Sequence, residues 1–154
     1  MKVYQVHYKQ KLNINLLKAW EFFSNPLNLR LITPPWLNFK VTSKEVNKMY
    51  EGQIITYKVR PLFNIPVTWV TEITHVSEPY YFVDEQRFGP YKMWHHEHKF
   101  KEVSEEMIEM EDTVTYIIPF GILGIILNEI IVKRKIDEIF YYRKKILDSL
   151  FNKK

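Results

Sequence analysis

The sequence predicts an α+β fold in which a curved antiparallel sheet of seven strands wraps around one long C-terminal helix. Three observations carry this prediction: an opening strand followed by two short helices, a central region of six β-rich runs joined by short turns, and a final amphipathic helix. The chain has 154 residues, of which 46% are hydrophobic, so one core of ordinary size is expected. We therefore expect a single domain over residues 1–154.

The first quarter of the chain predicts a strand and two short helices. Residues Val3 to Lys11 alternate like a strand, and Asn13 or Asn15 can cap the short helix that follows. A second helical turn over Leu27 to Ile32 is expected to end at Thr33-Pro34-Pro35, because a residue that precedes proline is pushed out of the helical region.

The central region changes to β-rich runs separated by glycine, proline, asparagine and glutamate. Strands are expected at Phe39 to Val46, Gln53 to Val59, Val67 to Val76, Tyr80 to Arg87, Tyr91 to Lys101 and Met107 to Ile118. The connections are short, whereas parallel neighbours need a crossover of about a dozen residues or more. The strands are therefore expected to be antiparallel to their neighbours.

The C-terminal region predicts a long helix after Pro119, Gly121 and Gly124. Its apolar stripe consists of Ile126, Ile130, Val132, Ile136, Ile139, Phe140, Ile146, Leu147 and Leu150. Charged residues lie between these positions, so the stripe is expected to cover the sheet while the other face meets solvent.

Composition excludes several classes of function. The chain has no cysteine, which rules out disulfides, thiolate metal sites and cysteine nucleophiles. Its four glycines form neither a phosphate-binding loop nor a dinucleotide fingerprint. The net charge of +4 is a modest excess concentrated in the last helix and in the tail at Lys153 and Lys154, so we expect no nucleic-acid partner.

No export or membrane insertion is expected either. The first residues alternate like a strand and lack the apolar stretch of a secretory signal, which favours a cytoplasmic location. The most lipid-like stretch, Ile117 to Leu127, is too short and too interrupted by proline and glycine to span a bilayer.

One face of the sheet is expected to collect polar and aromatic side chains. Alternate residues of a strand share a face, so Trp94, His96, His98 and Phe100 point the same way. With the adjacent strands, the residues expected on this shared face include Phe82, Asp84, Gln86, Trp94, His96, His98, Asp112 and Tyr116.

The two hairpins suggest how these side chains pair. If Gly89-Pro90 centres one turn and Val103 to Glu105 the next, Asp84 lies opposite His96 and His96 lies opposite Asp112. A slip by one residue pair would exchange partners but keep every group on the same face.

Three interpretations of this cluster compete. It is a buried polar network whose members satisfy one another, or a polar anchor at the floor of an apolar pocket, or a catalytic or metal-binding group. A His-x-His pair is a weak metal signal without a third ligand of known position, and no HExxH motif occurs. The expectation is therefore no metal and no cofactor.

The same stretch carries a family resemblance. The sequence around Phe82-Val83-Asp84-x-Gln86, Gly89-Pro90-Tyr91 and Trp94-x-His96-x-His98-x-Phe100 resembles the bacterial SRPBCC ligand-binding family, within the START, polyketide-cyclase and birch-pollen-allergen superfamily. Further matching residues are Asn28, Leu29, Ile32 to Pro35, Gly52, Tyr57, Trp69, Ile73, Asp112, Tyr116, Pro119 and Gly121. The resemblance implies a helix-grip fold with a deep hydrophobic cavity between sheet and helix. It implies no catalytic residue.

The leading functional expectation is noncatalytic binding of a small hydrophobic or amphipathic molecule, such as a lipid, in that cavity. The expected ligand-binding residues are Tyr57, Trp69, Phe82, Asp84, Gln86, Trp94, His96, His98, Asp112 and Tyr116. One alternative is a cyclase-, aromatase- or dehydratase-type enzyme that uses His96 with Asp84 or Asp112. Another is a noncatalytic protein-interaction module. The sequence leaves the ligand and the oligomeric state open.

Overall fold

The computed structural model describes residues 2–43, 48–61 and 64–152. Its elements are β1 (Tyr4–Leu12), α1 (Leu16–Phe23), α2 (Pro26–Leu29), a 3-10 helix (Pro35–Leu37), β2 (Lys40–Val41), β3 (Gln53–Val59), β4 (Val67–Ser77), β5 (Tyr81–Phe88), β6 (Met93–Ser104), β7 (Met107–Ile117), α3 (Gly121–Leu127), a π-helical turn (Asn128–Val132) and α4 (Lys133–Phe151). The predicted order of strands and helices is confirmed.

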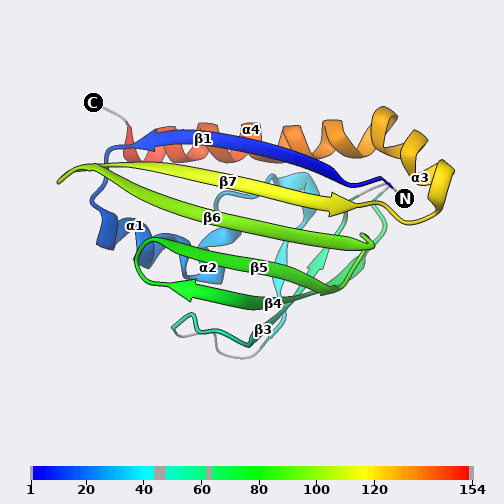
Figure 1. The fold of residues 1–154 in the computed structure, drawn as a ribbon, viewed down its shortest axis with the longest axis horizontal. Helices are drawn as coiled ribbons and strands as arrows, with labels where there is room; N and C mark the ends of the chain where they lie inside the picture. The colour runs from blue at the N-terminus through cyan, green and yellow to red at the C-terminus, as the bar shows by residue number, and fades with distance from the viewer. Residues whose placement is uncertain (1, 44–47, 62–63, 153–154) are drawn as a thin grey trace.

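The strands form one curved antiparallel sheet (Figure 1). Across the described residues the sheet has seven strands in the order β1-β7-β6-β5-β4-β3-β2, so consecutive strands from β2 to β7 pair with one another. Strand β1 closes the sheet against β7, with Tyr4 opposite Tyr116 and Leu12 opposite Ile108. The predicted seven-stranded antiparallel sheet with a long C-terminal helix is confirmed.

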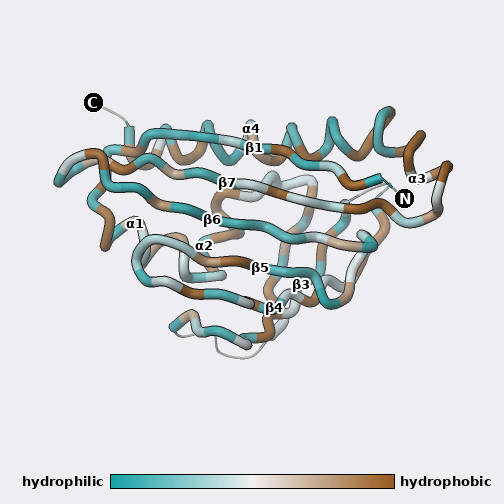
Figure 2. Tube along the Cα trace, viewed as in Figure 1, coloured by the Kyte–Doolittle hydropathy of each residue, from teal (hydrophilic) through white to brown (hydrophobic). Residues whose placement is uncertain are grey.

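The C-terminal helix runs along the sheet beside β1, and α1 and α2 lie at the end of the molecule that holds the C-terminus (Figure 1). The inward face of α4 buries Ile136, Phe140 and Leu147, and Val132 of the preceding π-helical turn is also buried. In Figure 2, both hydrophobic and hydrophilic residues recur along the turns of α4, as in an amphipathic helix. Among the described residues, no helix combines the length and apolar character needed to cross a membrane.

The predicted apolar stripe is wrong at its two ends. Ile126, Ile130 and Leu150 are exposed instead of facing the sheet. A π-helical turn at Asn128–Val132 separates α3 from α4, and such a turn holds more residues than an α-turn. Ile126, which precedes the turn, and Ile130, which lies in it, are therefore rotated away from the sheet, whereas Leu150 lies in the last turn of α4.

The structure identifies the cap of the first short helix and shows that the second is shorter than predicted. Asn15, not Asn13, caps α1, because its side chain accepts a hydrogen bond from the Lys18 amide at 2.9 Å. Helix α2 ends at Leu29, short of the predicted Ile32, and the Leu31 amide bonds to the Asn28 carbonyl three residues back. The chain thus leaves the helix by a tighter turn before the prolines.

Strand boundaries match closely except at two places. Strand β2 covers only Lys40–Val41 of the predicted Phe39 to Val46, of which residues 44–47 lie outside the described residues. Strand β6 begins later and runs further than expected, to Ser104, so the turn to β7 is made by Glu105 and Glu106. The predicted tail at Lys153 and Lys154 also falls outside the described residues.

This turn changes the pairing of the histidines. Asp84 lies opposite His96, as predicted. His96, however, lies opposite Val114, and His98 takes the place opposite Asp112. The prediction of His96 opposite Asp112 is wrong by one residue pair, because the register shifts between Glu102 and Ser104 and the turn lies further along the chain.

Candidate ligand-binding site

A cavity of about 170 Å³ lies between the sheet, the α1–α2 region and α4, and it is partly open to solvent. Most of its lining is apolar, with Ile55, Ile73 and Ile136 among the buried contributors. Seven of the ten predicted ligand-binding residues line it: Tyr57, Trp69, Phe82, Asp84, Trp94, His96 and His98. Strands β3, β4, β5 and β6 supply these side chains, because alternation sends every second residue to the concave face.

The other three predicted residues do not line this cavity. Gln86 reaches along the β5–β6 turn, where its amide donates to the Tyr91 carbonyl at 2.7 Å. Tyr116 is fully buried and donates to the Asn128 side chain at 2.9 Å. Asp112 lies behind the histidines and borders a second hollow of about 410 Å³, between β1, β7 and α4. We take the first cavity as the candidate site because most residues that line it are hydrophobic and because Asp84, His96 and His98 all lie on its wall.

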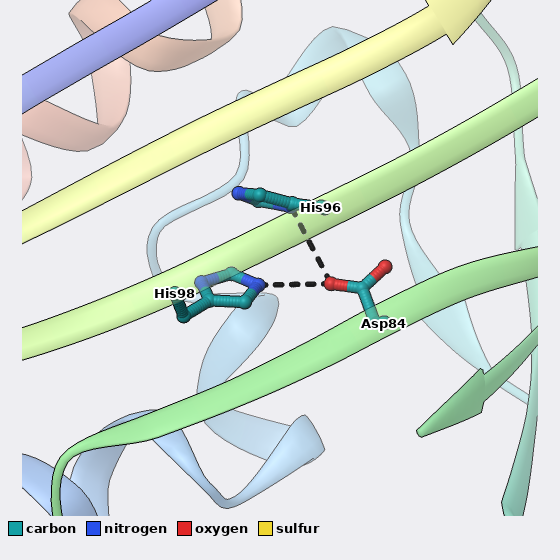
Figure 3. A group of neighbouring side chains, drawn as sticks. All are labelled: Asp84, His96 and His98. Carbon is teal, nitrogen blue, oxygen red and sulfur yellow. Dashed lines mark hydrogen bonds and ion pairs between the residues drawn. The ribbon is translucent and has the colours of Figure 1, made fainter. Parts of the chain in front are cut away.

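The His–Asp cluster consists of Asp84, His96, His98 and Asp112. His96 and His98 leave the same side of β6 with their ring centres 3.8 Å apart, and each ring contacts both carboxylates. Figure 3 shows how the two histidine rings face Asp84. His98 Nε2 lies 2.8 Å and His96 Nδ1 lies 3.4 Å from the same Asp84 oxygen, Oδ2. The sequence prediction that these four groups meet on one face agrees with this geometry.

Asp112 supports both rings from the opposite side. Its Oδ1 lies 2.9 Å from His96 Nε2, with hydrogen-bond geometry, and 2.9 Å from His98 Nδ1. A carboxylate only accepts hydrogen bonds, so His96 Nε2 carries the hydrogen. The side chains of His96, His98 and Asp112 are each less than a tenth exposed, while that of Asp84 is 19% exposed.

Burial and mutual attraction set the charges in the cluster. Burial raises the pKa of each aspartate, but the histidines and Arg143 outweigh it and hold both carboxyl pKa values below their ordinary range. For His96, burial and the neighbouring His98 lower the pKa. For His98, burial is outweighed by the contacts with Asp112 and Asp84, which raise the pKa. The cluster therefore favours two ionised carboxylates and unlike protonation of the two rings.

Arg143 is a member of this site that the sequence prediction missed. It lies buried on α4, with Nη1 3.7 Å from Asp112 Oδ2 and its guanidinium 4.7 Å from the ring centre of Phe140. It also lines the cavity. The signal was its spacing: Ile136, Phe140, Arg143 and Leu147 follow one helix face, so a cation within that stripe indicates a buried acidic partner.

Comparisons with solved structures agree with this architecture. Zhui aromatase/cyclase from Streptomyces sp. R1128 superposes with a TM-score of 0.71 at 12% identity, over 97% of this chain and 96% of that one. A START superfamily protein from Mycobacterium smegmatis gives 0.67 at 8% identity, over 96% and 97%. A point mutant of Thalictrum flavum norcoclaurine synthase, in complex with a transition state analogue, gives 0.66 at 10% identity, over 97% and 96%.

These likenesses establish the fold. The chain has the helix-grip architecture of the START, aromatase/cyclase and plant-allergen proteins, in agreement with the sequence resemblance. The sequence itself matches no protein-family model and no curated protein. At these identities the fold is shared, and the site must be argued from its own residues.

Proposed function

We propose that this protein binds a small hydrophobic or amphipathic molecule in the cavity between the sheet and the C-terminal helix. The observation that carries the proposal is a largely apolar cavity whose aspartate, histidine and arginine side chains are Asp84, His96, His98 and Arg143, close to one another. Ligand sites typically combine an apolar lining with a few fixed polar groups that orient the ligand. The proposal takes residues 1–154 as one ligand-binding domain that acts in the cytoplasm.

The size of the cavity defines what fits inside it. An apolar cavity of about 150 Å³ in another protein binds benzene. The 170 Å³ measured here therefore suits one ring or a short branched chain, with the rest of a larger ligand leaving through the open side. Trp69 and Trp94, which meet edge to face with ring centres 5.3 Å apart, give an aromatic wall for such a group.

The polar groups favour a ligand with an oxygen function. Arg143 and the imidazoles offer donors, and Asp84 offers an acceptor, all on the cavity lining. A hydroxyl, carbonyl or carboxylate oxygen placed there would meet the cluster while the apolar part meets the aromatic wall. This arrangement suits an amphipathic molecule better than a pure hydrocarbon.

An enzyme of the cyclase, aromatase or dehydratase kind is the second candidate, and one observation favours it. His96 contacts Asp112 through Nε2 and faces Asp84 through Nδ1, at the cavity. An imidazole held by a carboxylate in this way can transfer protons to a bound substrate. If a substrate is found, His96→Gln should then reduce kcat far more than it changes substrate affinity.

Binding is tested with a fluorescent fatty acid and a cavity-filling variant. Ile55 lines the cavity and is 1% exposed, whereas Ile54 on the same strand points outward and is 49% exposed. Ile55→Trp should weaken binding by at least about tenfold, equivalent to ~1.4 kcal/mol. Ile54→Trp adds the same side chain outside the cavity and should bind as the natural protein does.

The outcomes separate the alternatives. Loss of binding in Ile55→Trp alone supports a cavity ligand, provided that both variants unfold at similar temperatures. Native mass spectrometry of freshly purified protein should also show a co-purifying molecule of small mass. No probe binding and no co-purifying molecule would contradict the proposal, and a partner protein captured equally by both variants would favour the interaction module.

A further inference from the structure

We infer that Asp84, His96 and His98 form a site for a divalent transition-metal ion that opens into the cavity. The three side chains offer two imidazole nitrogens and one carboxylate oxygen, all within 4.8 Å of one another. Two histidines and one carboxylate form a donor set that suits zinc and non-haem iron(II). The His-x-His pair provides only two ligands. The pairing of β5 with β6 provides the third, because it places Asp84 opposite His96.

The first argument concerns the direction of the nitrogen lone pairs. Asp112 Oδ1 accepts a hydrogen bond from His96 Nε2 at 2.9 Å, so His96 Nδ1 keeps the lone pair of the neutral ring; Asp112 Oδ1 also lies 2.9 Å from His98 Nδ1, but without hydrogen-bond geometry. His96 Nδ1 presents that lone pair toward Asp84 Oδ2 at 3.4 Å, and His98 Nε2 donates a hydrogen bond to the same oxygen at 2.8 Å, so an ion would take the place of the His98 hydrogen. The three ligand atoms thus face one another, and a metal ion would replace the hydrogen that His98 Nε2 shares with Asp84.

The second argument concerns the support behind the two rings. Histidines that bind metals usually donate their other ring hydrogen to a carboxylate or carbonyl, which fixes the tautomer and the ring orientation. Asp112 accepts this hydrogen bond from His96 Nε2, lies 2.9 Å from His98 Nδ1, and is itself buried and close to Arg143, at 3.7 Å. The cluster therefore has the inner donors and the outer carboxylate that a metal site needs.

The third argument concerns access and charge. Asp84, His96 and His98 line the cavity while Asp112 does not, so a bound ion would keep its open coordination position toward the cavity. With neutral rings, two carboxylates and Arg143 leave one net negative charge before the ion is added. A divalent ion changes this to one positive charge, which an anionic oxygen, such as hydroxide or carboxylate, would neutralise.

The test titrates chelator-treated protein with zinc by calorimetry in mildly alkaline buffer, and repeats the titration with cobalt(II) to record its visible absorption. We expect one ion per chain and a cobalt spectrum of low coordination number. His98→Gln and Asp84→Asn should each weaken binding by at least about tenfold. Far-UV circular dichroism and thermal unfolding in chelator establish that each variant is folded.

His95 provides the matched control. It belongs to the same strand but faces away from the cavity, where it contacts Glu85 at 2.8 Å and Glu97 at 3.6 Å. His95→Gln should leave zinc affinity unchanged. Binding that is lost in His95→Gln and kept in His98→Gln would overturn the proposal, because it would place the ion on the outer face of the sheet.

A measurement on the natural protein avoids dependence on the variants. Nitrogen-15 NMR of the histidine rings should show zinc-dependent shifts at His96 Nδ1 and His98 Nε2, with His95 unchanged. Absence of stoichiometric zinc binding, or shifts confined to the outward histidines, would refute the site. The fatty-acid probe is measured on chelator-treated protein, so the ligand-binding proposal stands or fails independently of the metal.

Discussion

Tyr116 on β7 and Asn128 in the π-helical turn form a hydrogen bond of 2.9 Å in which neither residue is exposed to solvent. The tyrosine hydroxyl donates to Asn128 Oδ1, while Asn128 Nδ2 has no partner within the described residues. This contact ties the last strand to the point where the C-terminal helix changes its winding. It positions the helix face that closes the cavity.

Tyr116→Phe should therefore destabilise the fold. The change removes one hydroxyl and leaves the buried Asn128 oxygen without its donor, which costs ~1–3 kcal/mol of unfolding free energy. Chemical denaturation measures the difference. Tyr141→Phe is the control, because Tyr141 lies exposed on α4, and its effect should stay within about 0.5 kcal/mol. Equal stability of the two variants would show that the contact does not hold the helix.

The same hydroxyl makes stability depend on alkaline pH. Burial raises the pKa of Tyr116 to about 12 from the ordinary 10.0, with the hydrogen bond to Asn128 opposing the rise and Asp137, Tyr4 and Glu129 adding to it. Because the pKa of Tyr116 is higher in the folded than in the unfolded protein, the tyrosine contributes its full stabilisation below about pH 10. This contribution is lost as the pH rises toward 12. The stability difference between the natural protein and Tyr116→Phe should shrink across that range. A difference independent of pH would contradict this assignment.

Removing the charge of Arg143 should lower the free energy of unfolding by more than removing any surface charge does. Arg143→Met takes away the buried cation that faces Asp112, and breaking a buried pair typically costs ~3–5 kcal/mol, because the remaining charge stays desolvated. The neighbouring Lys144 pairs with Asp148 on the surface, so Lys144→Met should cost no more than about 1 kcal/mol.

A double variant separates charge from packing at this position. If the cost of Arg143→Met comes from the uncompensated carboxylate, adding Asp112→Asn should recover part of the lost unfolding free energy. If the costs of Arg143→Met and Asp112→Asn simply add, the guanidinium acts through its contact with Phe140 instead. Urea unfolding of the two single variants and the double variant distinguishes these results.

The sequence predicts the face of the His–Asp cluster better than its pairing. Alternation along a strand fixes which side chains share a face, and a slip of two residues preserves it. The partner across the hairpin depends on one added residue near Val103 and on a turn at Glu105 and Glu106. Glutamates in a turn carry little information on its position, so the sequence pattern pairs His96 with the aspartate that lies opposite His98.

The helix residues of the site were harder to predict for another reason. Arg143 and Asn128 are polar, and a polar residue is buried only where the fold supplies a partner from a distant strand. Asp112 and Tyr116 are those partners, and their identity follows from the packing of α4 and the π-helical turn on β7. A pattern within the helix can reveal Arg143 as an anomaly, but it cannot name the acid that it meets.

In the β5–β6 turn, the side chain of Gln86 forms two hydrogen bonds with the backbone of Tyr91, and we call this contact the clasp. The Gln86 amide donates to the Tyr91 carbonyl at 2.7 Å, and the Tyr91 amide donates back to Gln86 Oε1 at 3.2 Å. A Cβ atom added at Gly89 would meet that same amide group. The glycine thus leaves room for the glutamine, and the clasp holds Tyr91 at the cavity wall beside Trp69 and Trp94.

This clasp predicts strong coupling between two substitutions. Gln86→Ala removes both hydrogen bonds, and Gly89→Ala should displace the glutamine and lose the same bonds, so each should cost ~1–3 kcal/mol of unfolding free energy. In the double variant the added methyl group no longer meets a side chain, so Gly89→Ala should cost less than about 0.5 kcal/mol there. Denaturant unfolding of the four proteins gives the coupling free energy. Additive costs would mean that Gly89 is needed for the turn backbone itself and not for the glutamine that crosses it.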